Sequence, residues 1–240
     1  MTTIGNNLQQ VLGRIAQACS AAGRDPAGVR LLAVSKTFGA DAMRLAAEAG
    51  QRAFGENYIQ EGVEKIAALR QGPTPWAPPL QWHCIGPVQS NKTRQVAEHF
   101  DWVHTVDREK IAQRLSDQRP ASLAPLDVCI QVNVDGGATK AGVPPPEALA
   151  LARAVALLPR LRLRGLMSIP EPAPDFAAQY AVHAAAKALF EQIRSEGGEG
   201  FAAFDTLSLG MTADLEAAIH AGSTLVRVGT GLFGGRTAPA

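Results

Sequence analysis

The stretch Leu126-Asp127-Val128-Cys129-Ile130-Gln131-Val132-Asn133-Val134 is the most β-branched run in the chain. It predicts a strand, because valine and isoleucine fit an extended backbone. Shorter apolar runs recur on both sides of it, and segments with apolar residues at helical spacing separate them. We expect eight strands, over residues 30–36, 52–57, 80–85, 102–106, 126–134, 161–169, 206–209 and 224–228.

Helices are predicted before and between these strands. An extra N-terminal helix places Leu8, Val11, Ile15 and Cys19 on one face, which is a 3.6-residue period. Further helices follow from apolar periodicity or from acidic starts and glycine stops. They are expected over residues 41–49, 58–70, 92–99, 108–118, 147–157, 182–193 and 214–221.

Strict alternation of eight strands with helices in 240 residues is typical of a closed (β/α)8 barrel, the TIM type. An open doubly wound sheet is the alternative, because periodicity does not reveal closure. We treat residues 1–240 as one domain with its core over about residues 8–235.

Composition excludes several classes of protein. Hydrophobic residues make up 46% and charged residues 19%, which is unlike a disordered chain. Lys plus Arg is 23 against Asp plus Glu 22, so no basic excess points to nucleic acid. Cys19, Cys84 and Cys129 are odd in number and widely spaced, which argues against disulfides and a structural zinc site. No signal peptide or membrane span is apparent, so we expect a cytoplasmic protein.

Functional side chains of such a barrel lie where strands end. Lys36 closes the first apolar strand, and partial burial there would lower its pKa and free its amine to form a Schiff base with an aldehyde. An ordinary solvated lysine is the alternative. The other polar strand ends are Glu56, Asn57, His83, His104, Asn133, Ser168 and the turns after the last two strands.

Those two turns contain glycines, in Ser208-Leu209-Gly210-Met211-Thr212 and Val228-Gly229-Thr230-Gly231. Glycine lets the backbone approach an anion, and exposed N–H groups and hydroxyls favour phosphate. Ordinary turns with Thr212 as a helix N-cap are the alternative. Asp214 and Glu216 follow closely and would repel an anion unless they point away.

An imine-forming lysine facing a phosphate site indicates a phosphorylated aldehyde. Pyridoxal 5′-phosphate (PLP) is the common biological example, but a sugar-phosphate aldolase uses the same two elements. The residues alone leave both open.

Several motifs together resemble the pyridoxal phosphate homeostasis protein family, whose single-domain barrels are similar to the N-terminal domain of alanine racemase. The resemblance runs from about Leu8 to Gly235. It rests on Val34-Ser35-Lys36-Thr37, Phe54-Gly55-Glu56-Asn57-Tyr58 with Gln60-Glu61, Trp82-His83 with Ile85-Gly86, Gln89-Ser90-Asn91-Lys92, Arg164-Gly165-Leu166-Met167, Leu207-Ser208-Leu209-Gly210-Met211 and Val226-Arg227-Val228-Gly229-Thr230.

The resemblance implies a role for each matching residue. Lys36 would hold PLP covalently as an internal aldimine, Arg227 would face the pyridine nitrogen, and Asn57 would lie close to the ring. His83 would either line the pocket or be satisfied by its neighbours, and Cys84 and Cys129 would be core residues. The residues expected around the phosphate are Ser208, Gly210, Met211, Thr212, Gly229 and Thr230.

This chain departs from the family pattern at four positions. Thr212 replaces a usual serine but keeps the hydroxyl, and Gly231 stands where alanine is common. Phe38 replaces a frequent second lysine and Gly137 a frequent acidic residue, which affects only secondary contacts or lysine-to-lysine transfer of the cofactor. Lys140 remains available for such transfer, although a solvated loop lysine is the simpler interpretation.

Three functions are therefore weighed. A PLP carrier in intracellular PLP homeostasis is favoured over an amino-acid racemase, because no second β domain follows the last strand and neither Tyr58 nor Tyr180 is an obvious second base. An aldolase would need a carboxylate near Lys36, and Glu56 is the candidate. We expect no dedicated catalysis, no metal, nucleic acid or membrane, a monomer, and apo PLP-dependent enzymes as partners.

Overall fold

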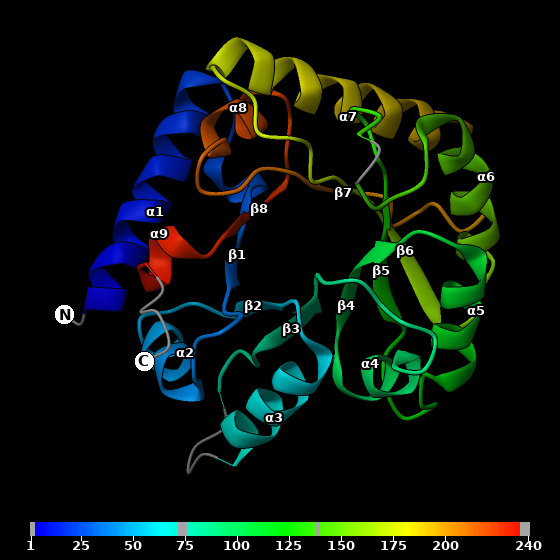
Figure 1. Ribbon diagram of the computed structural model, residues 1–240, viewed down its shortest axis with the longest axis horizontal. Helices are drawn as coiled ribbons and strands as arrows, with labels where there is room; N and C mark the ends of the chain where they lie inside the picture. Colours follow the sequence, from blue (N-terminus) through cyan, green and yellow to red (C-terminus); the bar gives the residue numbers. More distant parts are fainter. Residues whose placement is uncertain (1–2, 72–75, 138–139, 236–240) are drawn as a thin grey trace.

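The chain was described with a computed structural model, in which residues 3–71, 76–137 and 140–235 can be placed. Eight parallel strands pair in chain order and close on themselves, which confirms the (β/α)8 barrel and excludes the open sheet (Figure 1). The strands are β1 (Arg30–Val34), β2 (Ala53–Glu56), β3 (Gln81–Cys84), β4 (Trp102–Val106), β5 (Leu126–Gln131), β6 (Leu161–Met167), β7 (Thr206–Ser208) and β8 (Leu225–Val228).

Helices surround the barrel, and the extra N-terminal helix is confirmed. The final four-residue helix is an addition to the prediction, because one turn is too short to show a period. The helices are α1 (Thr3–Ala21), α2 (Ala40–Glu48), α3 (Ile59–Arg70), α4 (Thr93–His99), α5 (Glu109–Gln118), α6 (Pro145–Ala156), α7 (Phe176–Glu196), α8 (Leu215–His220) and α9 (Thr230–Phe233), with a 3₁₀ turn at Pro26–Gly28.

Six strands end earlier than predicted: β1, β2, β3, β5, β6 and β7. β1 ends at Val34, because the chain turns at Lys36 and Thr37 and the Phe38 N–H donates to the Ser35 carbonyl at 3.0 Å. β5 and β6 also end early, at Gln131 and Met167. Apolar residues continue past the ends of β5 and β6, so composition could not show where pairing stops in those two strands.

Apolar side chains pack on both sides of the barrel wall. One large cluster lies between the strands and the surrounding helices, and includes Phe54, Phe100 and Phe190. A smaller cluster contains Leu32 of β1, Leu225 of β8 and Ile85, which directly follows β3. This packing makes the barrel a filled core rather than a pore.

Trp102 at the start of β4 anchors a charged layer in the barrel. The guanidinium carbons of Arg164 and Arg30 lie 4.7 and 5.1 Å from its ring centroid. Arg164 is ion-paired with Asp127 at 3.2 Å and with Asp205 at 2.8 Å. These residues come from the first halves of their strands or just before them, which leaves the opposite end for a ligand site.

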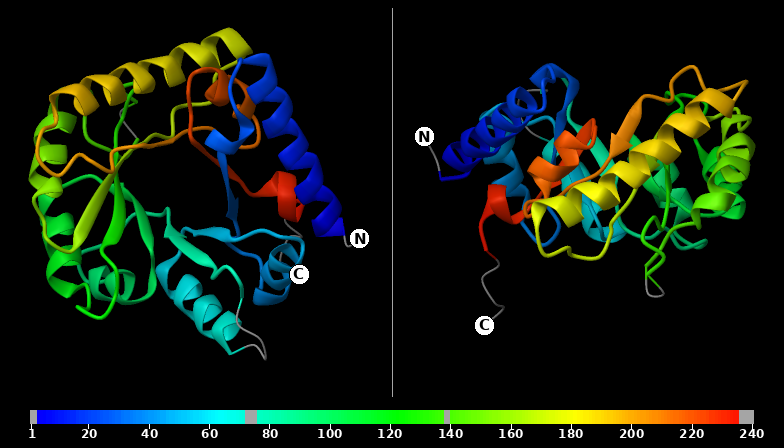
Figure 2. Two further views of the ribbon diagram at one scale, coloured as in Figure 1. Left: turned by 180° about the vertical axis from the view of Figure 1, so that it is seen from behind. Right: turned by 90° about the horizontal axis from the view of Figure 1, so that it is seen from above.

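Helix α1 lies beside α8 and α9 (Figures 1 and 2). Its apolar face is buried, and Arg14, which is partly buried, bonds to Glu216 at 2.8 Å and to the Thr212 carbonyl at 2.9 Å. The extra helix therefore braces the turn that follows β7.

Within the placed residues, no helix combines the length and hydropathy needed to cross a membrane. The same part of the chain shows no group of three or more side chains arranged to bind a metal ion.

Gly165 in β6 has a φ of 153°, and a Cβ there would lie 1.7 Å from the Thr206 carbonyl oxygen. We predict that Gly165→Ala lowers the free energy of unfolding by about 3 kcal/mol or more, since the backbone of β7 must move. Gly13→Ala is the matched control, because nothing lies within 4 Å of its added Cβ in α1. It should raise that free energy by about 1 kcal/mol. Urea unfolding followed by circular dichroism measures the free energy of unfolding of both variants. Equal changes in the two variants would contradict the close approach of Gly165 to β7.

Candidate cofactor-binding site

The register of β1 decides which residues meet at one end of the barrel. Ala33 pairs with Val228 of β8 on one side, and Val34 pairs with Gly55 of β2 on the other. Because parallel strands end at the same edge, the residues that follow them are neighbours. Lys36, partly buried in the turn after β1, therefore lies between the turn at Gly229 and the end of β2.

Asn57 directly follows β2, as the sequence predicted for a strand-end residue. Its Oδ1 is buried and has no hydrogen-bond partner among the placed residues. Its backbone is pressed against Gly86, where a Cβ would lie 2.0 Å from the Asn57 carbonyl oxygen. An unpaired buried acceptor is costly, so Asn57 Oδ1 is available to accept a hydrogen bond from a bound ligand.

The two glycine turns meet across β7 and β8. Thr230 Oγ1 and Thr212 Oγ1 are 3.5 Å apart, and a Cβ on Gly231 would lie 3.2 Å from Thr212 Cγ2. Gly210 has a φ of 86°, a conformation that glycine adopts without strain. The structure thus brings Gly210, Thr212, Gly229 and Thr230 together.

The two acidic residues after the first glycine turn form hydrogen bonds with other protein groups. Asp214 accepts from the Met211 N–H at 2.6 Å and bonds to buried His183 at 2.9 Å, and Glu216 pairs with Arg14. Burial raises the pKa of Asp214, but these two hydrogen bonds outweigh it, so that pKa lies below its ordinary value. Asp214 also occupies the N-cap position of α8, so Thr212 is not the cap. The Met211 N–H is consequently engaged inside the protein.

Arg227 lies inside the barrel wall near its ligand-facing end, 3% exposed. It donates to the Ser208 carbonyl and hydroxyl at 2.6 and 2.7 Å, and to the Ser168 carbonyl at 2.8 Å. None of these partners is charged. Burial lowers the pKa of Arg227 to about 10, so the guanidinium is still a cation at neutral pH.

Ser208 belongs to this buried group. Its hydroxyl accepts from Arg227 and lies 3.0 Å from His104 Nδ1, and His104 Nε2 lies 2.9 Å from His83 Nδ1. The Ser208 side chain is therefore engaged beside Arg227, whereas the hydroxyls of Thr212 and Thr230 face each other. His83, expected to line the pocket or to be satisfied by its neighbours, is buried with its Nε2 unpaired among the placed residues.

Arg227 can only donate, so the Ser208 hydroxyl accepts from it and keeps one proton and one further lone pair. We assign that proton to the bond with His104 Nδ1, in which case His104 carries its proton on Nε2 and donates to His83 Nδ1. His83 is left with its proton on Nε2. Burial, followed by the positive charges nearby, lowers the pKa of both histidines well below the ordinary value, so both are neutral.

The sequence identified His83 and His104 only as strand-end polar residues. His83 lies on β3 and His104 on the neighbouring strand β4. His83 pairs in register with Trp102, which is two residues before His104. This offset places the two imidazoles side by side. Inward-facing histidines on neighbouring strands were the signal that could have revealed the pair.

The remaining candidates lie elsewhere. Cys84 and Cys129 are buried, and burial raises the pKa of each thiol to about 12, which suits core residues. Lys140 is ion-paired with Glu171 at 3.3 Å rather than fully solvated. Glu56 is completely buried and bonded to Lys65 at 2.9 Å.

These residues suit PLP in three respects. The unpaired Asn57 Oδ1 offers an acceptor, and buried Arg227 offers a cation without an acidic hydrogen-bond partner. The paired glycine turns bring two threonine hydroxyls together, which can donate to an anion. Lys36 adds a primary amine at the same end of the barrel.

Comparison with known proteins gives a consistent result. The profile of the family described as "Alanine racemase, N-terminal domain" matches residues 7–237. A pyridoxal phosphate homeostasis protein of Pseudomonas aeruginosa is 57% identical over 236 residues, covering 98% of this chain and 97% of that protein. One of Escherichia coli (strain K12) is 52% identical over 237 residues, 98% of each chain. The solved structure of PipY from Synechococcus elongatus with PLP bound has a TM-score of 0.77 and 36% identity, covering 92% of this chain and 100% of that one.

The order of protons in the buried chain can be measured directly. We predict that long-range ¹H–¹⁵N spectra show His83 and His104 as Nε2–H tautomers that do not titrate between about pH 5 and 8, because both are buried. An Nδ1–H signal or a titration of either buried histidine would contradict the assignment.

Proposed function

Because the chain belongs to the alanine racemase N-terminal domain family, and within it to the pyridoxal phosphate homeostasis proteins, we propose that it binds PLP reversibly and acts in intracellular PLP homeostasis. The observation that carries the proposal is the meeting of Lys36, Asn57, Arg227 and the two glycine turns at one end of the barrel. We place the function in the cytoplasm and assign the whole of residues 1–240 to one PLP-binding domain.

When bound, PLP supplies an aldehyde that condenses reversibly with an amine, a pyridine nitrogen and a phosphate. Lys36 would provide the amine and Arg227 would donate to the ring nitrogen. Asn57 would accept a hydrogen bond close to the ring. The phosphate would be surrounded by Gly210, Met211, Thr212, Gly229 and Thr230, with Ser208 holding Arg227 in place.

Arg227 favours binding over turnover. Its pKa of about 10 keeps it protonated at neutral pH, so it is a hydrogen-bond donor to whatever faces it. A ring nitrogen that accepts such a bond stays unprotonated, and an unprotonated ring withdraws electrons weakly. Arg227 therefore weakens the ring as an electron sink without abolishing that capacity.

The side chains that a racemase or an aldolase would need support the same conclusion. Tyr58 and Tyr180 are 59% and 42% exposed, so both side chains face solvent rather than an enclosed site. Glu56 is fully buried in an ion pair with Lys65, so it is unsuited to exchange protons with a substrate. We therefore propose a monomeric carrier without dedicated catalysis, which supplies apo PLP-dependent enzymes.

The covalent residue can be tested by reduction. Purified protein incubated with PLP should be yellow, and borohydride should fix the pyridoxyl group on Lys36. Lys36→Ala should lose the visible band, whereas Lys110→Ala, which removes an exposed lysine of α5, should keep it. Peptide mapping that places the label on another lysine would overturn the assignment of Lys36.

Turnover can be tested separately. We predict that the PLP-loaded protein racemises alanine and serine well below about 1 per second, the slow end of ordinary enzymes. Chiral chromatography with a complete mass balance measures this, and alanine racemase is the positive control. A rate in the ordinary range would contradict the carrier assignment.

A further inference from the structure

Lys65 on α3 is a buried cation that lies behind the turn carrying Lys36. Its side chain is 7% exposed. Its Nζ donates to the Ser35 carbonyl at 2.8 Å and to Glu56 at 2.9 and 3.1 Å, and it pairs with Glu61 at 2.5 Å. An ammonium has three N–H donors, and here they meet one carbonyl and two carboxylates.

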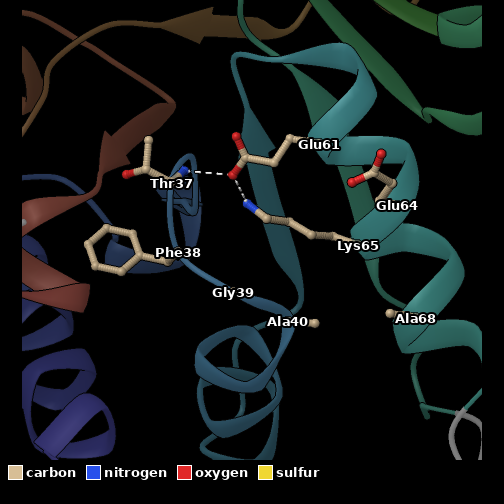
Figure 3. Close-up of a pocket in the computed structure, with 8 residues that line it drawn as sticks. All are labelled: Thr37, Phe38, Gly39, Ala40, Glu61, Glu64, Lys65 and Ala68. Atoms are coloured by element: carbon tan, nitrogen blue, oxygen red, sulfur yellow. Dashed lines mark hydrogen bonds and ion pairs between the residues drawn. The ribbon is translucent and has the colours of Figure 1, made fainter. Parts of the chain in front are cut away.

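These contacts reach the chain on both sides of Lys36. Ser35 is held twice, through its carbonyl by Lys65 and through its hydroxyl, which donates to Glu56 at 2.6 Å. Thr37 is held by its backbone N–H, which donates to Glu61 at 2.7 Å (Figure 3). The residues before and after Lys36 are thus fixed to one cluster.

Thr37 also adopts a φ of 69°, the only positive φ among the non-glycine residues that the structure places. This left-handed conformation is unfavourable for a β-branched residue and persists only where neighbouring contacts impose it. The bond from Thr37 to Glu61 is such a contact. It is charge-assisted, and it determines how the backbone leaves Lys36.

We propose that Lys65, Glu56 and Glu61 form a clamp that positions Lys36, so that its amine meets the aldehyde of a ligand held by the rest of the site. The proposal rests on the proposed function, since it takes Lys36 as the residue that bonds to PLP. The three residues touch the backbone around Lys36 and are positioning residues, not catalytic ones.

Glu61 is the part of the clamp that can be changed safely. It lines a cleft of about 470 Å³ on the outer side of the turn, together with Thr37, Phe38, Glu64 and Lys65 (Figure 3). Its side chain is 30% exposed, so its removal creates no cavity in the core. Glu64 lines the same cleft one turn along α3, and among the placed residues its side chain bonds to Gln60 rather than to the turn, which makes it a matched control.

The test compares two ligands. PLP reports the whole site, whereas 4-deoxypyridoxine 5′-phosphate lacks the aldehyde and reports only the ring and phosphate contacts. In Glu61→Ala we expect affinity for PLP to fall about tenfold, because a charge-assisted bond to the turn is lost. Affinity for the deoxy analogue should change by less than about twofold, the range of a surface substitution.

Three further variants complete the design. Glu61→Gln keeps an acceptor oxygen for Thr37 and should restore most of the PLP affinity, and Glu64→Ala should resemble the wild type with both ligands. Lys65→Met should act more strongly than Glu61→Ala, and its thermal unfolding is recorded because it leaves Glu56 buried without a cation. The conclusion rests on Glu61→Ala if Lys65→Met does not fold.

Two results would overturn the clamp proposal. In one, Glu61→Ala lowers the affinities for PLP and for the deoxy analogue by the same factor. In the other, it changes neither affinity. Failure of the proposed function looks different, because Lys36→Ala would then bind PLP as the wild type does. If only the clamp proposal is wrong, Lys36→Ala still binds PLP more weakly than the wild type, whereas Glu61→Ala binds it with wild-type affinity.

Discussion

Ala33 lies opposite Val228 on one side and Phe54 on the other, and this parallel register of β1 controls the rest of the site. Three short strands that end at the same edge bring residues 36, 57 and 229 together from distant parts of the sequence. Closure of the barrel is essential to this arrangement, since β8 and β1 would be separated at opposite edges of an open sheet. Fold and site therefore depend on the same set of backbone hydrogen bonds.

Electrostatics inside the barrel divide the site into two parts. Arg227 brings a positive charge whose hydrogen-bond partners are neutral oxygens, and the histidines connected to it are neutral too. On the outer side of the Lys36 turn, the clamp contains two carboxylates and one ammonium. A ligand that carries an anion and a ring nitrogen matches the inner part, while the outer part holds the backbone in place.

The sequence predicted the elements that depend on local patterns. The eight strands, the N-terminal helix and the position of Lys36 at a strand end all follow from apolar runs and periodicity, and the closed barrel is confirmed. The direction of side chains at the site was harder to predict. Asp214 follows the phosphate-type turn and was expected to repel an anion, yet it bonds to the Met211 N–H and to His183.

Long-range contacts explain what the sequence missed. Lys65 looks like an ordinary helix lysine, because its partners Ser35 and Glu56 lie 30 and 9 residues away along the chain. The histidine pair and the left-handed Thr37 likewise depend on strand register and on a bond from another element.

The most direct test of the central claim is a crystal structure of the protein grown with PLP. We expect continuous density from Lys36 Nζ to the ligand, with the pyridine nitrogen at Arg227 and the phosphate between Thr212 and Thr230. A ligand bound elsewhere on the molecule, with both glycine turns holding only water, would contradict it.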